Sequence, residues 1–468
     1  MKPLHSLLVL ALLSPAGAWA DPSGLPGADL ADPGVTAMPG RLKLDLKASE
    51  AAALAHSPNL KAARFDELSA GRQADSQESV LLPLLSVDGS AKYMDKVPSV
   101  ALLPGKPPIE FGSHNNWSAG VNFSWTVWDW GALRGAWKSA QATAAARSEA
   151  TRMTQRQVKL AVRAAYLQIR LACEQVHLVA DSLSLAQDQL RDVEAKVKAG
   201  TSGRIDLASS RQETLDRRRT LREARASLAN AIRDLSALTG TAAVGDPSLA
   251  LDSDTAAHPP TGIEPASLVV EVEPVDAILT ALGTWPGKID AESQPLVRQW
   301  DAQAKAAHQM EKSAKAGLLP KVQVTARSSY DYPDQILPES IQQNVVGVSA
   351  SMPLFDWGRA KRQSDAAKDQ ARAAEARRDQ AQEDWRRDVA KASGDFQALK
   401  AEADLDRQAS QQAAELAKLV RESYKSGRSS YLEADSADLK ALQAQVQSAR
   451  TAVQVLLQAA VLSSLTSD

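Results

Sequence analysis

The chain has 468 residues, and 54 Lys and Arg against 56 Asp and Glu give it a net charge of −2. Phosphate binding needs clustered excess positive charge, so this balance gives no reason to expect a nucleic acid partner. The single cysteine, Cys173, excludes an intrachain disulfide framework. The six histidines are too scattered for metal-ligand spacing, so we expect no metal and no other cofactor.

The first residues predict export. Residues 1–20 begin with the basic Lys2, continue with an apolar run and end in the small-residue pattern Ala18-Trp19-Ala20, which is typical of a signal peptide. Residues 21–46 are expected to form a flexible N-terminal segment. Nothing downstream is apolar and long enough for a membrane helix, so a mature chain that enters a membrane would do so as strands.

The chain contains an internal repeat. Residues 121–131 resemble residues 348–358, and both segments end in Asp-Trp-Gly. Gly200 and Gly427 each lie 69 residues after the glycine of the preceding motif. We therefore divide the mature chain into a first repeat (47–240), a proline-rich linker (241–293) and a second repeat (294–468). Each repeat predicts a helix, two strands, a very long helix and a return helix.

The two 69-residue intervals predict long helices. The first interval has no proline, and at ~1.5 Å per residue its helix would be on the order of 100 Å long. Its apolar residues recur every seven positions in two rows, which predicts a left-handed coiled coil with neighbouring helices. The rows are Val162, Ile169, Val176, Leu183, Leu190 and Val197, and Ala165, Ala172, Val179, Ala186 and Val193. The second interval is less regular because Asp406 and Ser410 interrupt its row.

Two segments that alternate with period two precede each long helix, and they predict strands with two different faces. They cover residues 85–93, 117–127, 322–330 and 346–352, close to the ~9–11 residues that a tilted strand needs to cross a bilayer. An aromatic girdle at a membrane interface is predicted at Trp117, Trp125, Trp128 and Trp130. Four strands cannot close in a bilayer, so further copies must supply the missing edges. Two chains would give eight strands and three would give twelve.

These features resemble the TolC-like outer-membrane efflux protein family over roughly residues 43–465. The resemblance rests on the Asp-Trp-Gly motifs, the Leu-Leu-Pro motifs at 81–83 and 318–320, the run Ala-His-Ser-Pro-Asn-Leu at 55–60, and the two tip turns. It implies an α+β membrane protein with a long coiled-coil α-helical barrel. The four strands of each chain would contribute to a trimeric 12-stranded transmembrane β-barrel. The implied location is the Gram-negative outer membrane, with a periplasmic helical tunnel.

The resemblance also implies a function and partners. The protein would be an outer-membrane channel without enzymatic activity, the passive exit duct of a tripartite efflux or type I secretion system. Its homotrimer would contact outer-membrane lipid and dock onto a periplasmic adaptor (membrane fusion) protein. The adaptor would couple it to an inner-membrane pump.

The same resemblance assigns residues to the tip of the tunnel. The adaptor-contact tip would comprise Gly200, Thr201, Ser202, Gly203, Ile205, Gly427, Ser429, Ser430 and Leu432. The periplasmic gate candidates are Asp206, Tyr424, Glu433 and Arg428. The match departs at Ser429 and Ser436, where the family has an arginine and an acidic residue. Solvated charges at helix ends are the alternative interpretation of these candidates.

Two other functional classes share part of the pattern. A periplasmic coiled-coil adaptor or scaffold that spans no membrane would have the same helices and signal peptide. It would have no use, however, for four two-faced strands and a tryptophan cluster. An exported enzyme is disfavoured because no paired carboxylates, nucleophile elbow or ligand cluster stands out.

Overall fold

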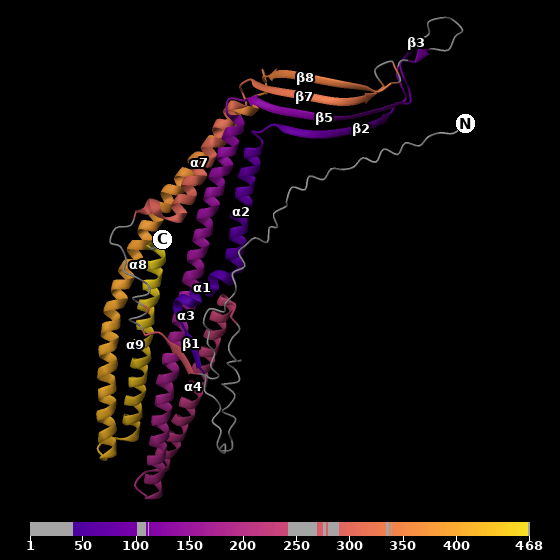
Figure 1. Ribbon diagram of the computed structural model, residues 1–468. Coiled ribbons are helices and arrows are strands. Elements are labelled where there is room, and N and C mark those ends of the chain that lie inside the picture. Colours follow the sequence, from indigo (N-terminus) through magenta and orange to yellow (C-terminus); the bar gives the residue numbers. More distant parts are fainter. Residues whose placement is uncertain are drawn as a thin grey trace, which may run out of the picture.

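The structure is a computed structural model that describes residues 41–100, 109–110, 112–241, 269–274, 278, 290–333, 337 and 339–466. The predicted signal peptide and most of the segment 21–46 lie outside these residues. The molecule is elongated, with one long sheet at one end and two helical hairpins that run away from it (Figure 1). Among the described helices, none combines the length and the apolarity that a membrane crossing requires.

Two hairpins of long helices form the body of the molecule. The first consists of α3 (Ala132–Lys198) and α4 (Arg204–Thr239), and the second of α8 (Arg359–Lys425) and α9 (Tyr431–Thr466). Both α3 and α8 have 67 residues, as the equal intervals in the sequence predict. The predicted apolar rows of α3 are buried or half-buried along their whole length.

Three shorter helices support the long ones. The helices α1 (Leu46–His56) and α2 (Pro58–Ser79) pack along α3, and α7 (Pro295–Ala316) packs against both α3 and α8. Ser57 caps α2 through its hydroxyl, and a proline occupies the first turn of both α2 and α7, where no intrahelical donor is required.

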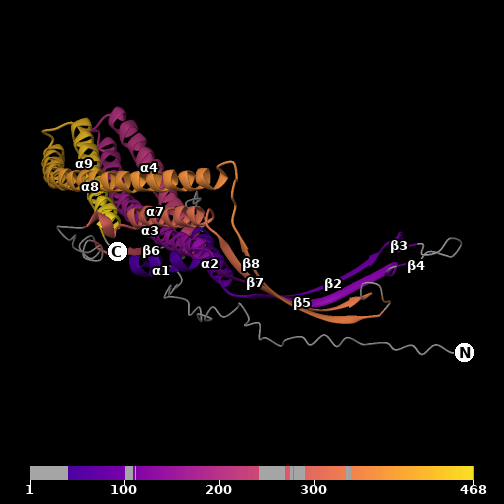
Figure 2. The same ribbon diagram turned by 90° about the horizontal axis from the view of Figure 1, so that it is seen from above.

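The sheet contains four antiparallel strands in the order β2-β5-β7-β8. They are β2 (Leu84–Tyr93), β5 (Asn115–Trp128), β7 (Lys321–Tyr332) and β8 (Ile341–Ser351), and they include all four predicted segments except the last residue of the fourth. The sheet is curved and extends to one side of the helices (Figure 2). Two short strands, β3 (Ser99–Val100) and β4 (Ile109–Glu110), pair beyond its far end.

Neither β3 and β4 nor a second pair of short strands was predicted. The parallel pair β1 (Arg41–Leu44) and β6 (Val269–Val272) joins the N-terminal segment to the linker. The expectation of a flexible segment over 21–46 is therefore wrong for residues 41–44, and Leu46 already belongs to α1. The side chain of Tyr166 on α3 holds this pair, because its hydroxyl donates to the Leu44 carbonyl (3.1 Å) and accepts from the Glu273 amide (3.2 Å).

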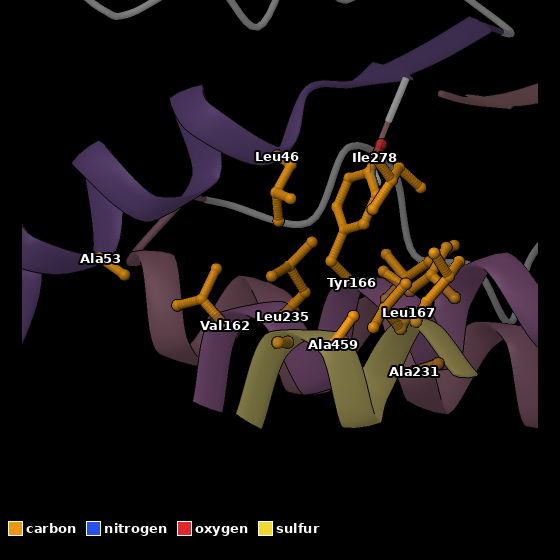
Figure 3. Close-up of a cluster of buried hydrophobic side chains, with 13 residues drawn as sticks. Leu46, Ala53, Val162, Tyr166, Leu167, Ala231, Leu235, Ile278 and Ala459 are labelled. Carbon is orange, nitrogen blue, oxygen red and sulfur yellow. The ribbon is translucent and has the colours of Figure 1, made fainter. Parts of the chain in front are cut away.

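The main core lies where the linker residue Ile278 and α1 meet the two hairpins, around Tyr166 (Figure 3). Its buried side chains come from α1, α3, α4 and α9: Leu46, Ala53, Val162, Tyr166, Leu167, Ile169, Ala231, Ile232, Leu235, Leu456, Ala459 and Ala460. Cys173 packs against this cluster, and burial raises the pKa of its thiol to about 11. A packing role therefore fits Cys173.

Candidate functional site

The two faces of the sheet differ in polarity. Where β5 pairs with β7, Trp125 lies opposite Val324 and Phe123 opposite Ala326 on one face. On the other face Ser124 lies opposite Thr325, and Asn122 opposite Arg327. The outer strands continue the apolar face with Leu85, Val87 and Ala91 on β2 and with Val346, Val348 and Ala350 on β8. The sheet therefore presents one lipid-compatible face and one water-compatible face.

Aromatic side chains lie at both ends of the apolar face. At the far end Trp117 stacks on Tyr332, with ring centroids 6.0 Å apart. At the helical end Trp125 donates to the Leu81 carbonyl (3.1 Å), and Trp128 meets Trp130 edge to face. Trp117 and Trp125 are eight residues apart on β5, which corresponds to about 27 Å at ~3.4 Å per residue. This spacing is comparable to the ~25 Å apolar band of transmembrane sheets.

The two Asp-Trp-Gly motifs form equivalent turns between strand and helix. The carboxylates of Asp129 and Asp356 each accept hydrogen bonds from the glycine amide of their motif and from an amide in the first helical turn. Trp130 and Trp357 have positive φ angles of 55° and 56°, an uncommon conformation for a bulky residue. Trp357 is 80% exposed beside Phe355, a second aromatic pair that the sequence analysis left out of the girdle.

The two tip turns are also equivalent. Gly200 has a φ of 74° and Gly427 a φ of 76°, a backbone that glycine adopts without strain. In each turn the glycine amide donates back across three residues and the next amide donates back across five, which is the Schellman motif. Ile205 and Leu432 follow the turns and are 82% and 72% exposed. Most of the predicted adaptor-contact tip is therefore exposed, with Ser202 and Ser429 half-buried.

The four gate candidates do not form one network within the chain. Asp206 accepts from the Ser202 hydroxyl (2.7 Å), and Glu433 accepts from the Ser430 amide (2.9 Å), so both carboxylates cap the start of their own return helices. Arg428 is exposed.

Among the four gate candidates, Tyr424 is the one that contacts the other hairpin in the described part of the chain. The Lys196 ammonium of α3 lies 4.0 Å from the centre of the Tyr424 ring on α8, and Tyr431 packs edge to face against the same ring. A cation placed over an aromatic face in this way is attracted by the ring. Lys196 was not predicted as a site residue.

A second link between the hairpins lies deeper, and sequence reasoning missed it. Asp438 on α9 accepts a hydrogen bond from Gln189 on α3 (Nε2 to Oδ2, 2.7 Å) and forms an ion pair with Arg421 on α8. We call Gln189, Arg421 and Asp438 the tip tie. Asp438 and Gln189 are nearly buried, and hydrogen bonds to charged groups are the stronger ones.

Further charges surround the tip tie. Arg217 on α4 is only 6% exposed and pairs with Glu213 one helical turn away. Burial, together with the nearby carboxylates of Glu213 and Asp438, raises the pKa of Asp435 on α9 to about 6 against the opposing effect of Arg217. The hairpins therefore meet at a partly buried cluster with one more acid than base.

A model of the outer membrane efflux protein family matches residues 51–241 and 290–467. The chain belongs to this family. It is an outer-membrane exit duct of an efflux system in a Gram-negative cell. Family members are transport conduits, and they act with adaptor proteins and inner-membrane pumps.

Solved channels share this fold at low sequence identity. The outer membrane protein VceC of Vibrio cholerae is 20% identical with a TM-score of 0.71, covering 90% of this chain and 96% of its own. The CmeC outer membrane channel of Campylobacter jejuni is 17% identical with a TM-score of 0.71, covering 90% and 85%. The open state of the MtrE outer membrane channel of Neisseria gonorrhoeae is 18% identical with a TM-score of 0.67, covering 90% and 88%. No curated protein matches the sequence significantly.

Proposed function

We propose that three copies of this chain form one duct by joining β2 of each copy to β8 of the next, giving a twelve-stranded barrel. The open edges of the sheet carry this proposal. β2 and β8 are the outer strands of the four-stranded sheet, so each leaves one row of backbone donors and acceptors unpaired. In a bilayer each such group costs several kcal/mol, so both edges need partner strands.

The aromatic side chains at the two ends of the apolar face support the membrane position of this barrel. Trp117 would lie at one interface, and Trp125, Trp128 and Trp130 at the other, where amphipathic rings are favoured. Phe355 and Trp357 extend the second group, since both are strongly exposed in the single chain. The polar face would then line a water-filled lumen.

The tip turns would dock onto a periplasmic adaptor, which connects the duct to an inner-membrane pump. Ile205 and Leu432 support this role because two large apolar side chains stand exposed on otherwise small and polar turns. A partner that covers them would remove apolar surface from water. The duct itself would be a passive conduit without catalytic activity, so the pump would select what is exported.

The tip would also act as a gate between the hairpins. The tip tie and the Lys196–Tyr424 contact join the first hairpin to the second, and their separation would widen the end of the tunnel. Asp206 and Glu433 would serve this gate indirectly, by fixing the starts of α4 and α9.

The duct is tested by extraction and by conductance. The full-length protein, expressed in Gram-negative cells, should leave the outer membrane only with detergent, migrate as a heat-modifiable trimer and conduct ions in planar lipid bilayers. A periplasmic scaffold would wash out without detergent. A protein that is soluble without detergent and gives no conductance would contradict the proposal.

A further inference from the structure

The polar face of the sheet carries a charged bridge that spans three strands. Arg327 on β7 reaches over β5 to β2, where its Nη2 donates to Asp88 Oδ2 (2.9 Å). On the way, Nη1 donates to Asn122 Oδ1 (3.1 Å) and Nη2 donates to the Ser118 hydroxyl (3.1 Å), both on β5. Asn122 in turn donates to the second oxygen of Asp88. The guanidinium is therefore fixed in position by partners on β5 and on β2, the strand beyond it.

A glycine in the middle strand leaves room for this bridge. Gly120 lies on the same face between Ser118 and Asn122, directly opposite Asp88 on one side and Ser329 on the other. A Cβ at Gly120 would approach the Cβ of Ser329 to 2.8 Å and the Ser328 carbonyl oxygen to 2.9 Å. The backbones of β5 and β7 lie too close together here for a side chain at Gly120. The long Arg327 side chain crosses the face at this glycine, where no side chain stands in its way.

A second carboxylate, that of Asp331, lies beside the bridge, and in the described part of the chain its hydrogen bonds come from two hydroxyls and not from a cation. Asp331 Oδ1 accepts from the Ser118 hydroxyl (2.5 Å), and Oδ2 accepts from the Ser329 hydroxyl (2.8 Å). The cluster thus holds two carboxylates and one guanidinium, and Arg327 and Asp88 are each more than a third exposed on this face. Lys92 and Lys321 lie on the same face nearer the two ends of the strands.

We propose that the Arg327–Asp88 pair is a selectivity-determining element of the barrel lumen. This rests on the proposed barrel, in which the polar face lines the lumen and threefold symmetry repeats the pair as a ring. The pair carries opposite charges of equal size, so it contributes little net field to a passing ion while both members are present. Removing either member exposes the charge of the other, and rings of fixed charge are what make a pore prefer cations or anions.

The expected effects have opposite signs. Arg327→Gln leaves the Asp88 and Asp331 carboxylates, so the cation-to-anion permeability ratio should rise at least about twofold, the effect of a unit charge acting across several ångströms of water. Asp88→Asn leaves the guanidinium and should lower the ratio by a similar factor. The double variant Arg327→Gln with Asp88→Asn removes the pair without changing the net charge, and it should return close to the wild-type ratio. This double variant is the matched control.

The permeability ratio is measured from the reversal potential across planar bilayers in a KCl gradient at low ionic strength, where screening is weakest. Each variant is tested with the tip intact and with the tip tie removed by Arg421→Gln and Asp438→Asn, so that the barrel is also tested where the tip does not limit the current. Asp331→Asn is a further variant that leaves the strand-spanning contacts in place. It should lower the ratio, which keeps the test decisive if a bridge variant fails to assemble.

Opposite shifts for the two single variants in either background, with recovery in the double variant, would support the proposal. Unchanged ratios in both backgrounds, or a double variant as far from wild type as the single ones, would overturn it. Failure of the duct itself looks different, because the wild-type protein would then form no conducting trimer at all.

Discussion

The two long helices α3 and α8 have the same length and the same kind of turn at both ends, yet they differ in what they bury. In the core, α3 contributes large side chains such as Val162, Tyr166 and Ile169. The buried residues of α8 are all alanine or serine: Ala360, Ser364, Ala367, Ala371, Ala374, Ala381, Ala392 and Ala417. Because apolar burial scales with area, α3 is held within its own chain far more strongly than α8.

This difference suggests how the first repeat can be rigid while the second repeat moves. On α8, the exposed Leu405, Leu416 and Leu419 are available to a neighbouring copy of the chain. Toward the tip, the second hairpin is joined to the first by the tip tie and the Lys196–Tyr424 contact, both of which are polar or ionic. We therefore expect α3 to respond to mutation in folding stability and α8 to respond in assembly and gating.

The largest effect should follow from a cavity in the core of α3. Ile169→Ala should lower the free energy of unfolding by about 2–5 kcal/mol, because the fully buried side chain leaves a void. Leu405→Ala on α8 is the matched truncation at an exposed site. It should change the unfolding of the chain by less than about 0.5 kcal/mol and act on the heat resistance of the trimer instead. Guanidinium unfolding in detergent measures the free energy of unfolding, and gel migration after heating measures the heat resistance of the trimer. Equal losses of unfolding free energy in the two variants would contradict the difference between α3 and α8.

The tip tie should dominate the gate. Asp438→Asn removes the charge that Arg421 and Gln189 share, which should shift the balance from closed to open by about 1.5–3 kcal/mol and raise single-channel conductance. The pair Asp206→Ala with Glu433→Ala should also raise conductance, but by less, because these carboxylates cap α4 and α9 locally. A gate carried by Asp206 and Glu433 directly would reverse this order.

A smaller loss is expected at the hydroxyl that fixes β1 and β6. Tyr166→Phe keeps the ring in the core but leaves the Leu44 carbonyl and the Glu273 amide without their partner, which should cost about 1–3 kcal/mol. Thermal unfolding followed by circular dichroism measures the loss. The same melting temperature for wild type and variant would mean that water replaces the hydroxyl without cost.

The smallest effect should depend on pH. The folded pKa of Asp435 lies near 6, above its ordinary value of 3.8, so the folded chain binds a proton more tightly than the unfolded chain. Stability should therefore fall as pH rises from about 4 to about 6 and stay lower above that range. The groups that face Asp435 are Glu213 and Arg217 from α4 and Asp438 on α9, whose partner Arg421 belongs to α8.

Asp435→Asn removes this dependence. The variant should gain about 1 kcal/mol over wild type at pH 7.5, after allowance for solvent screening, and little at pH 4.5. Asp216→Asn, at an exposed position of α4, is the control and should show no such difference. A gain of equal size at both pH values would show that burial and the nearby carboxylates do not penalise the charge of Asp435.

The sequence predicted the parts of the fold that depend on local period. The seven-residue repeat of apolar side chains and the Asp-Trp-Gly motifs located both long helices. The alternation of polar and apolar residues located all four long strands. The pair β1 and β6 escaped because four residues carry too little periodicity, and their pairing spans more than two hundred residues. Of the tip, the turns were predictable from Gly200 and Gly427, whereas the tip tie depends on contacts between three helices.

The sequence of the return helices carries a signal for the charged cluster at the tip. On α4 the apolar residues Ala224, Ala231 and Leu238 recur every seven positions, and on α9 so do Leu442, Ala449 and Leu456. Arg217 and Asp435 lie seven residues before the first member of these rows, so each charge occupies a position of an apolar row. A charge at such a position in a coiled coil needs a partner or shifts its pKa. Within the sheet, alternation predicted the polar face, but the reach of Arg327 across β5 could be recognised only from the strand register.

The joining of β2 to β8 of the next copy is tested most directly by cross-linking. In a Cys173→Ser background, Val87→Cys on β2 is combined in turn with Asn344→Cys, Val346→Cys and Val348→Cys on the same face of β8. The account predicts that one of these combinations oxidises in the outer membrane to a covalent trimer, which reduction returns to monomers. Disulfides only within single chains, or none in any combination, would contradict it.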